Sequence, residues 1–140
     1  MSLVEDGTLA LDDPVSKYLG EDAPRYKWKD VSPLRILHLL EQTSGMPGTS
    51  YADYKHYTQD ISPSAILKSR DLVARWQPGK FLSYANINHT IAAAVAEKAT
   101  GISFDSLVHD RVLQPLEMVD ASFRSDKMAS GTLLDSGDAS

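Results

Sequence analysis

A tyrosine and an asparagine two positions apart are the side chains of this sequence whose types and spacing could take part in catalysis. Tyr84 and Asn86 follow a Pro78-Gly79 pair and directly precede a long segment of helical pattern. Pro fixes one backbone angle and Gly accepts a positive φ, so the pair predicts a turn. At the entrance of a helix, a phenol and an amide could face one cleft, where one moves a proton and the other binds an amide.

The same two residues also have a purely structural interpretation. Asn is a common N-cap residue, and the ring of Tyr84 could pack into the core. Spacing alone favours this structural alternative, because short motifs often occur by chance. The choice between the two interpretations therefore depends on the rest of the chain.

Helical patterns surround the predicted turn. The strongest covers 87–100, where Ile87, Ile91 and Val95 recur at helical spacing and Gly101 can close the helix. Pairs of a capping residue and a proline, or a capping serine alone, predict further helices over 12–20, 32–42, 62–70 and 103–114. Residues 3–7 resemble the last turn of a helix that ends at a glycine. The predicted fold class is therefore mainly α, with little or no sheet.

The helical patterns predict one helical subdomain over 1–123. Within it, 49–60 reads as a loop with at most a turn or two of helix, carrying Tyr51, Tyr54 and Tyr57, and 119–123 as the possible start of a strand. From residue 124 onward Ser, Asp, Gly and Ala dominate, a composition that buries too little apolar surface to offset the entropy of ordering. We expect a disordered tail over 124–140.

Composition argues against several classes of protein. A net charge of −5 without a basic stripe argues against partners such as nucleic acid or an anionic membrane. No apolar run approaches the roughly 20 residues of a membrane span, and the first residues show no signal-peptide pattern. Without H-E-x-x-H, a close His pair, a phosphate-binding loop or G-x-G-x-x-G, the sequence predicts no metal and no cofactor.

Four blocks, in this order along the chain, resemble the serine β-lactamase and penicillin-binding protein superfamily, in particular its class C and esterase-like branch. They are 4–15, 36–40 with 43–47, 78–86, and 100–104 with 113–118. Together these blocks span most of residues 4–123. The sequence departs from the family pattern at Glu41-Gln42, where Thr-His is common, and at Glu117, where Gly is usual.

The resemblance implies an acyl-transfer enzyme that acts on a β-lactam, a D-Ala-D-Ala peptide or an ester. Its nucleophile would lie in a Ser-x-x-Lys motif, followed by Tyr-x-Asn and then by Lys-Thr-Gly or an equivalent such as His-x-Gly. By this resemblance Tyr84 is the catalytic proton shuttle and Asn86 is the substrate-binding residue. The first and third motifs do not occur in the 140 residues.

The missing motifs predict a fragment of such an enzyme that is inactive alone, since it lacks both a nucleophile and the lysines that would activate it. The expected partner is the missing α/β subdomain, and its absence would expose apolar surface that favours self-association. The alternative is a non-catalytic helical binding or interaction module derived from the same fold. Members of the family are often periplasmic or secreted in bacteria, and this sequence leaves its own localisation open.

Overall fold

The computed structural model describes residues 1–48, 62–68, 71–118, 120 and 121. The chain divides into two compact units, Met1–Phe104 and Asp105–Ser140. All the regular elements in the described residues are helical, and two isolated β-bridges are the only strand-like pairings among them. The predicted mainly α fold class is thus confirmed. The predictions for 49–60, with its three tyrosines, and for the tail over 124–140 lie outside the described residues, and the single subdomain over 1–123 stays a prediction.

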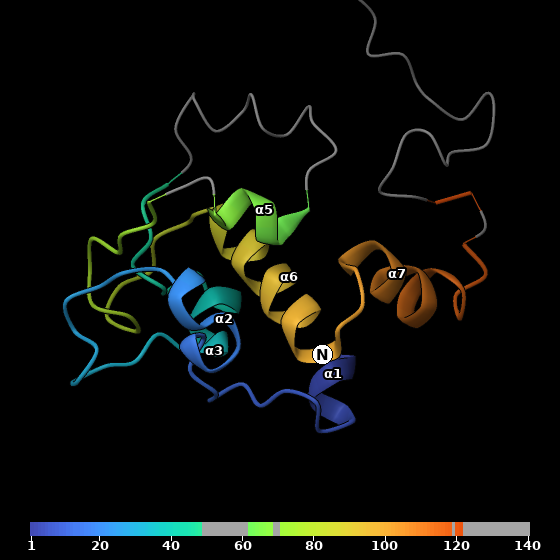
Figure 1. Ribbon diagram of the computed structural model, residues 1–140, viewed down its shortest axis with the longest axis horizontal. Helices are drawn as coiled ribbons and strands as arrows, with labels where there is room; N and C mark the ends of the chain where they lie inside the picture. The colour runs from blue at the N-terminus through green and yellow to red at the C-terminus, as the bar shows by residue number, and fades with distance from the viewer. Residues whose placement is uncertain (49–61, 69–70, 119, 122–140) are drawn as a thin grey trace, which may run out of the picture. The chain divides into compact units, whose positions relative to one another are not determined.

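Helix α6 (Ile87–Thr100) is the central element of the first unit. It ends as the sequence predicts, because Gly101 adopts a φ of 72° and donates its N–H to the carbonyl oxygen of Glu97 at 2.8 Å. Helices α2 (Ser16–Leu19), α3 (Ile36–Leu40) and α5 (Pro63–Lys68) all pack on α6. Figure 1 shows α6 running between α5 and the α2–α3 pair.

Small side chains allow these neighbours to approach α6 closely. Ala93, Ala94 and Ala96 are all buried on this helix, and Ile91 and Val95 have no exposed surface. The buried apolar side chains form one cluster that includes Leu9, Val15, Leu19, Leu34, Ile36, Leu39, Met46, Leu67, Ala74, Ala85, Ile87, Ile91, Ala94 and Val95. This core fixes the position of the N-terminal end of α6, where Asn86 lies.

The predicted start of α3 at Ser32-Pro33 is wrong. The helix begins four residues after Ser32, at Ile36, and it ends at Leu40 rather than at Gln42. The Ser32 hydroxyl donates to the carbonyl oxygen of Pro78 at 2.9 Å, a contact between distant segments that a local capping rule cannot anticipate. Ile36 and Leu39 of this helix are buried, whereas Leu40 is 45% exposed.

The predicted start of α2 at Asp13-Pro14 is also wrong, because α2 begins at Ser16. The Asp13 carboxylate instead accepts hydrogen bonds from the Ala10 N–H at 3.1 Å, from Lys17 Nζ at 2.9 Å and from the Tyr18 hydroxyl at 2.5 Å. Pro14 forms an antiparallel bridge with Arg35. The predicted end is confirmed: Gly20 follows α2 with a φ of 54° and opens the 3₁₀ turn η1 (Gly20–Asp22).

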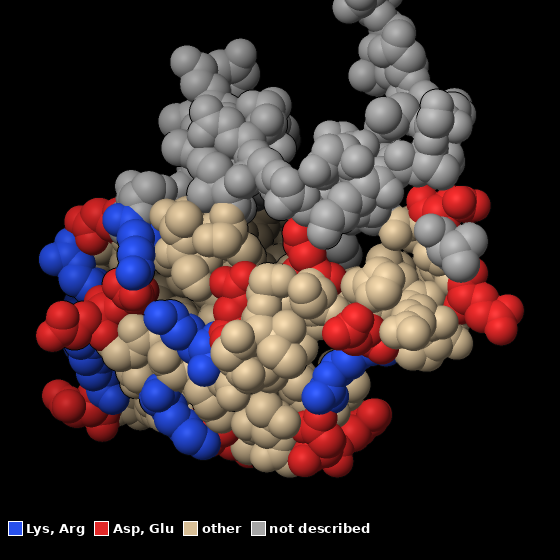
Figure 2. Space-filling model, turned by 45° about the vertical axis from the view of Figure 1, so that its right-hand side comes forward, with Lys and Arg blue, Asp and Glu red and all other residues tan. Residues whose placement is uncertain are grey.

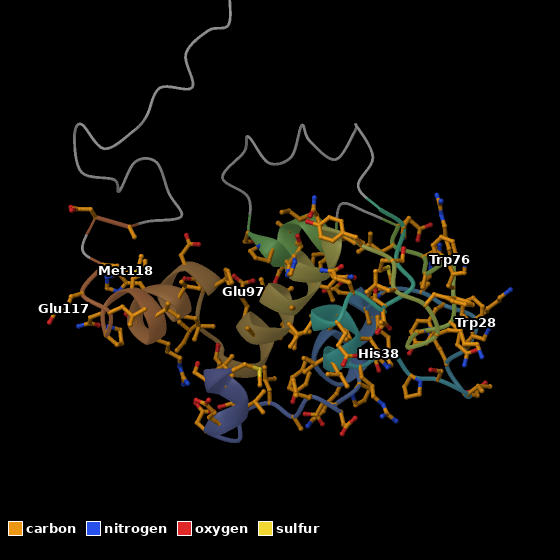
Figure 3. All side chains as sticks on the ribbon, turned by 180° about the vertical axis from the view of Figure 1, so that it is seen from behind. Trp28, His38, Trp76, Glu97, Glu117 and Met118 are labelled. Carbon is orange, nitrogen blue, oxygen red and sulfur yellow. The ribbon has the colours of Figure 1, made fainter. Side chains whose placement is uncertain are left out.

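Helix α5 begins where its sequence predicts. The Ser62 hydroxyl accepts the Ala65 N–H at 3.3 Å, so Ser62 caps the helix that Pro63 starts. Glu97 of α6, labelled in Figure 3, accepts from the Ser64 hydroxyl at 2.8 Å and from the Phe104 N–H at 3.1 Å. The Glu97 carboxylate therefore links α6 both to α5 and to Phe104, which lies beyond the C-terminal end of α6.

Helix α1 (Ser2–Glu5) is the short helical turn expected at the start of the chain. Gly7 lies just beyond it with a φ of 78°, and its N–H donates to the Val4 carbonyl oxygen at 3.2 Å. The prediction of a last helical turn closed by glycine is confirmed.

Helix α7 (Phe104–Val108) continues as the π-helix η2 (His109–Leu113). The sequence predicts one helix here, and the segment is helical. In η2, however, the hydrogen bonds span five residues instead of four, as the one from the Gln114 N–H to the His109 carbonyl oxygen at 2.8 Å shows. Glu117, labelled in Figure 3, has a φ of 55°. This left-handed conformation favours glycine. Of the possible strand start at 119–123, Asp120 and Ala121 are described, and neither is in a strand.

The described part of the chain has no helix with the length and apolarity that a bilayer span requires. Figure 2 shows Lys and Arg side chains interspersed with Asp and Glu over the visible face. No single-sign patch of the kind that binds a polyanion is seen on that face.

Candidate active site

Tyr84 and Asn86 lie together at the N-terminal end of α6. The Tyr84 side chain is 65% exposed, and its hydroxyl donates to Asn86 Oδ1 at 2.5 Å. Asn86 occupies the N-cap position of α6, but its side chain makes no capping hydrogen bond. The two features of the structural alternative, a capping amide and a packed ring, are therefore not what this segment shows. Its phenol and amide face each other at the surface.

The turn at Pro78-Gly79 forms as predicted. Gly79 has a φ of 79°, and the Lys80 N–H donates to the Gln77 carbonyl oxygen at 3.1 Å. The Gly79 N–H donates in turn to the Thr43 carbonyl oxygen at 2.8 Å. A Cβ on Gly79 would lie 3.0 Å from His38 Nε2, a contact that a small shift of the His38 ring would relieve, so the positive φ is what favours glycine here. The turn is thus attached to the segment that follows α3.

Gln42 holds the backbone on both sides of Tyr84. Its carbonyl oxygen accepts the Ser83 N–H at 2.8 Å, and its side-chain Oε1 accepts the Ala85 N–H at 3.0 Å. Sequence reasoning missed this residue, noting Gln42 only as a departure from the family pattern. Its contacts are with residues more than 40 positions away, as the separation of 43 between Gln42 and Ala85 shows.

A buried polar network lies beneath this contact. Asn88 Oδ1 accepts the Ser44 hydroxyl at 2.6 Å, and Asn88 Nδ2 donates to Gln42 Oε1 at 2.7 Å. The Ser44 oxygen also accepts the Met46 N–H at 3.1 Å. Both Asn88 and Ser44 have no exposed surface. Buried polar groups that satisfy one another in this way fix a single arrangement, and here they join the segment after α3 to the first turn of α6.

One sequence signal could have revealed this network. Asn88 stands three and seven positions before Ile91 and Val95, so it lies on the same helical face as two fully buried residues. A polar residue on an apolar face must find hydrogen-bond partners within the protein.

Gly45 allows the segment after α3 to approach a distant part of the backbone. A Cβ at this position would lie 2.1 Å from the Trp76 carbonyl oxygen, and φ is 79°. The carbonyl oxygen of Gly45 accepts the Arg75 N–H at 2.8 Å. Only glycine permits this approach, which explains the glycine at position 45.

His38 of α3, labelled in Figure 3, lies against the turn, since its ring is the group nearest to a Cβ placed on Gly79. Its Nδ1 accepts the Arg35 N–H at 3.2 Å. Partial burial and, to a smaller extent, the positive charge of Arg35 lower the pKa of His38. The hydrogen bond from Arg35 therefore requires the neutral form of the His38 ring, in which the Nδ1 lone pair is free to accept. In the described residues, no group of three or more His, Asp or Glu side chains is arranged to hold a metal ion.

The fold and these residues define a helical subdomain that carries a Tyr-x-Asn element directly before its central helix. A family model described as Beta-lactamase matches residues 1–137. The chain belongs to the β-lactamase family. Among curated proteins, it is 25% identical over 128 residues to the D-alanyl-D-alanine-carboxypeptidase/endopeptidase AmpH of Escherichia coli K12, covering 88% of this chain and 32% of that protein. It is 29% identical over 112 residues to the beta-lactamase of the same strain, covering 80% and 28%.

Solved structures agree with this assignment. The octameric penicillin-binding protein homologue from Pyrococcus abyssi is 29% identical and superposes with a TM-score of 0.71, covering 97% of this chain and 33% of that one. The chain thus spans about a quarter to a third of the length of the curated relatives it matches. Its fold is that of the helical subdomain of the β-lactamase and penicillin-binding protein fold.

Proposed function

We propose that this chain supplies the tyrosine–asparagine side of the acyl-transfer site of a serine hydrolase. The observation that carries the proposal is the exposed Tyr84 hydroxyl within hydrogen-bond distance of the Asn86 amide, on a backbone held by partly buried hydrogen bonds. Catalysis depends on holding such groups in place before the substrate arrives. Membership of the β-lactamase family supports the same class of reaction.

The proposed roles follow from the chemistry of the two side chains. Acyl transfer requires a group that takes the proton of a serine hydroxyl and returns it to the leaving group, and the Tyr84 oxygen has this role. Because Asn86 Oδ1 accepts from the phenol, the amide presents Nδ2 as its donor to a substrate carbonyl. A phenol ordinarily titrates near pKa 10, so it needs neighbouring cations before it acts as a base at neutral pH.

The substrate class is proposed from the names of the relatives. These include a D-alanyl-D-alanine carboxypeptidase/endopeptidase, a β-lactamase and a D-stereospecific amidohydrolase from Streptomyces. All of these names describe the cleavage of an amide or a strained lactam, consistent with a site that binds a substrate amide through Asn86. We propose a β-lactam or a D-Ala-D-Ala peptide as substrate, or an ester, the third class that the sequence resemblance implies.

We further propose that the nucleophile and the activating lysines come from an α/β subdomain that completes the cleft. No Ser or Thr in the 140 residues has a Lys three positions later, and neither Lys-Thr-Gly nor His-x-Gly occurs. Without these groups the chain has neither a nucleophile to accept the acyl group nor an oxyanion hole, so by itself it should not turn over a substrate.

Incubation of the purified chain with a fluorescent penicillin, followed by intact-mass analysis, tests whether the chain lacks its own nucleophile. We expect no covalent adduct and no hydrolysis of a chromogenic cephalosporin above the buffer rate. The E. coli β-lactamase that the chain resembles serves as the positive control. An adduct on this chain would mean that it contains its own nucleophile, and mapping the modified residue would then identify it.

A further inference from the structure

We propose that Gln42 is a positioning residue for Tyr84. The inference rests on the proposed function, because it takes Tyr84 as the group that moves a proton. Gln42 touches no substrate in this proposal. It acts by fixing the two peptide units that flank Tyr84.

The contacts of Gln42 are placed on both sides of the tyrosine. Its main-chain oxygen binds the N–H of Ser83, and its side-chain Oε1 binds the N–H of Ala85. Residues 81–85 form no regular secondary structure that could hold the backbone by itself. Two bonds from one residue therefore set the direction in which the exposed Tyr84 ring leaves the chain.

The orientation of the Gln42 amide is determined by its neighbours. Both the Ala85 N–H and Asn88 Nδ2 are donors, at 3.0 and 2.7 Å, so the atom that faces them must be the oxygen. Gln42 Nε2 then faces His89 Nε2 at 3.2 Å, where a neutral ring nitrogen accepts. All three contacts hold the side chain in one rotamer, so the acceptor for Ala85 is fixed before any substrate binds.

The backbone of Gln42 is itself in an unusual conformation. Its φ is 60°, in the left-handed region that non-glycine residues rarely adopt. Gln42 follows Glu41, the C-cap residue of α3; its N–H donates to the Leu39 carbonyl oxygen at 3.4 Å, and the Thr43 N–H donates to that of His38 at 2.9 Å. The end of α3 therefore holds this conformation, from which the carbonyl and side chain of Gln42 reach the residues on both sides of Tyr84.

A variant with a shorter amide side chain at position 42 distinguishes a positioning role from a general contribution to stability. Gln42→Asn keeps an amide and suits a positive φ, but its oxygen is withdrawn from Ala85 by about one carbon–carbon bond, roughly 1.5 Å. Gln42→Glu keeps the chain length and the acceptor, so it should restore the contact. Ser64→Ala removes a different hydrogen bond of α6, the one to Glu97, and is the matched control for loss of stability.

Two readouts in the 140-residue chain report on the tyrosine without any turnover. Amide hydrogen exchange measures the Ala85 N–H directly, and ¹⁹F NMR with 3-fluorotyrosine reports on the Tyr84 ring, whose signal is assigned by Tyr84→Phe. Asn86→Ala gives the ¹⁹F position of a Tyr84 that has lost its hydrogen bond. We expect Gln42→Asn to speed Ala85 exchange about 5- to 10-fold and to move the Tyr84 signal toward that position.

Gln42→Glu and Ser64→Ala should both leave the Tyr84 signal in place. The proposal is overturned if the Tyr84 signal stays unmoved in Gln42→Asn, or if Ser64→Ala moves it as far. Should Gln42→Asn not fold, Gln42→Gly tests the same loss at a residue that suits the positive φ, and failure of both would make Gln42 a residue of stability alone. None of these outcomes depends on the penicillin experiment, so the two proposals can fail separately.

Discussion

Removal of the Asn88 side chain should destabilise the protein far more than an ordinary polar substitution. Asn88→Ala deletes two hydrogen bonds, to Ser44 and to Gln42, each of which contributes about 0.5–1.5 kcal/mol. It also leaves the Ser44 hydroxyl as an unpaired donor at a site with no exposed surface, at a further cost of about 1–3 kcal/mol. The expected loss in the free energy of unfolding is therefore about 2–6 kcal/mol, equivalent to a fall in Tm of at least about 6 °C.

Urea unfolding followed by circular dichroism measures this loss, provided that the wild-type transition is two-state. Ser44→Ala and the double variant complete a thermodynamic cycle, in which the coupling between the two side chains should be about 1–2 kcal/mol. A loss below about 0.5 kcal/mol for Asn88→Ala, with an unchanged spectrum, would refute the reasoning, because that is the size of an uninvolved surface substitution.

Two further predictions concern Gly45 and Asp13. Gly45→Ala should cost about 2–5 kcal/mol, from the strain of its positive φ and from overlap with the Trp76 carbonyl. Gly7→Ala is the matched control, because Gly7 also has a positive φ, of 78°, but a Cβ there meets nothing within 4 Å. Equal losses of thermal stability in the two variants would contradict the steric argument. The hydrogen bond from Tyr18, then that from Lys17, lowers the pKa of Asp13 from 3.8 to about 2. This carboxylate thus stabilises the fold above pH 3.8 and ceases to do so as the pH falls toward 2. The difference in urea midpoint between wild type and Asp13→Asn should therefore shrink between about pH 5 and 2. A difference that stays constant over this range would contradict the prediction.

The elements that the sequence predicts well are those whose causes are local. The bounds of α6 follow from a long periodic pattern and from Gly101, and the start of α5 follows from the Ser62 cap. In both cases the groups that determine the boundary lie within one turn of it.

The predictions that fail are those in which distant contacts override a local rule. Ser32-Pro33 and Asp13-Pro14 both have the pattern of a helix start, yet Ser32 bonds to the distant Pro78 and Pro14 pairs with the distant Arg35. Gln42, which supports the candidate site, was missed for the same reason. Nothing near Gln42 in the sequence indicates that its side chain meets Ala85.

The hydrogen bonds between the segment after α3 and the start of α6 also bear on the order of folding. They join residues 43 to 46 positions apart, whereas the bonds within α6 are local. The entropy of closing so long a loop must be overcome before these contacts form, so α6 should form early and the peptide units around Tyr84 late. Because that entropy grows only logarithmically, doubling the length of the intervening chain would add only about 0.6 kcal/mol. An insertion between the two segments therefore costs little entropy, provided that it leaves helix α5 and the core residues Leu67 and Ala74 packed as they are.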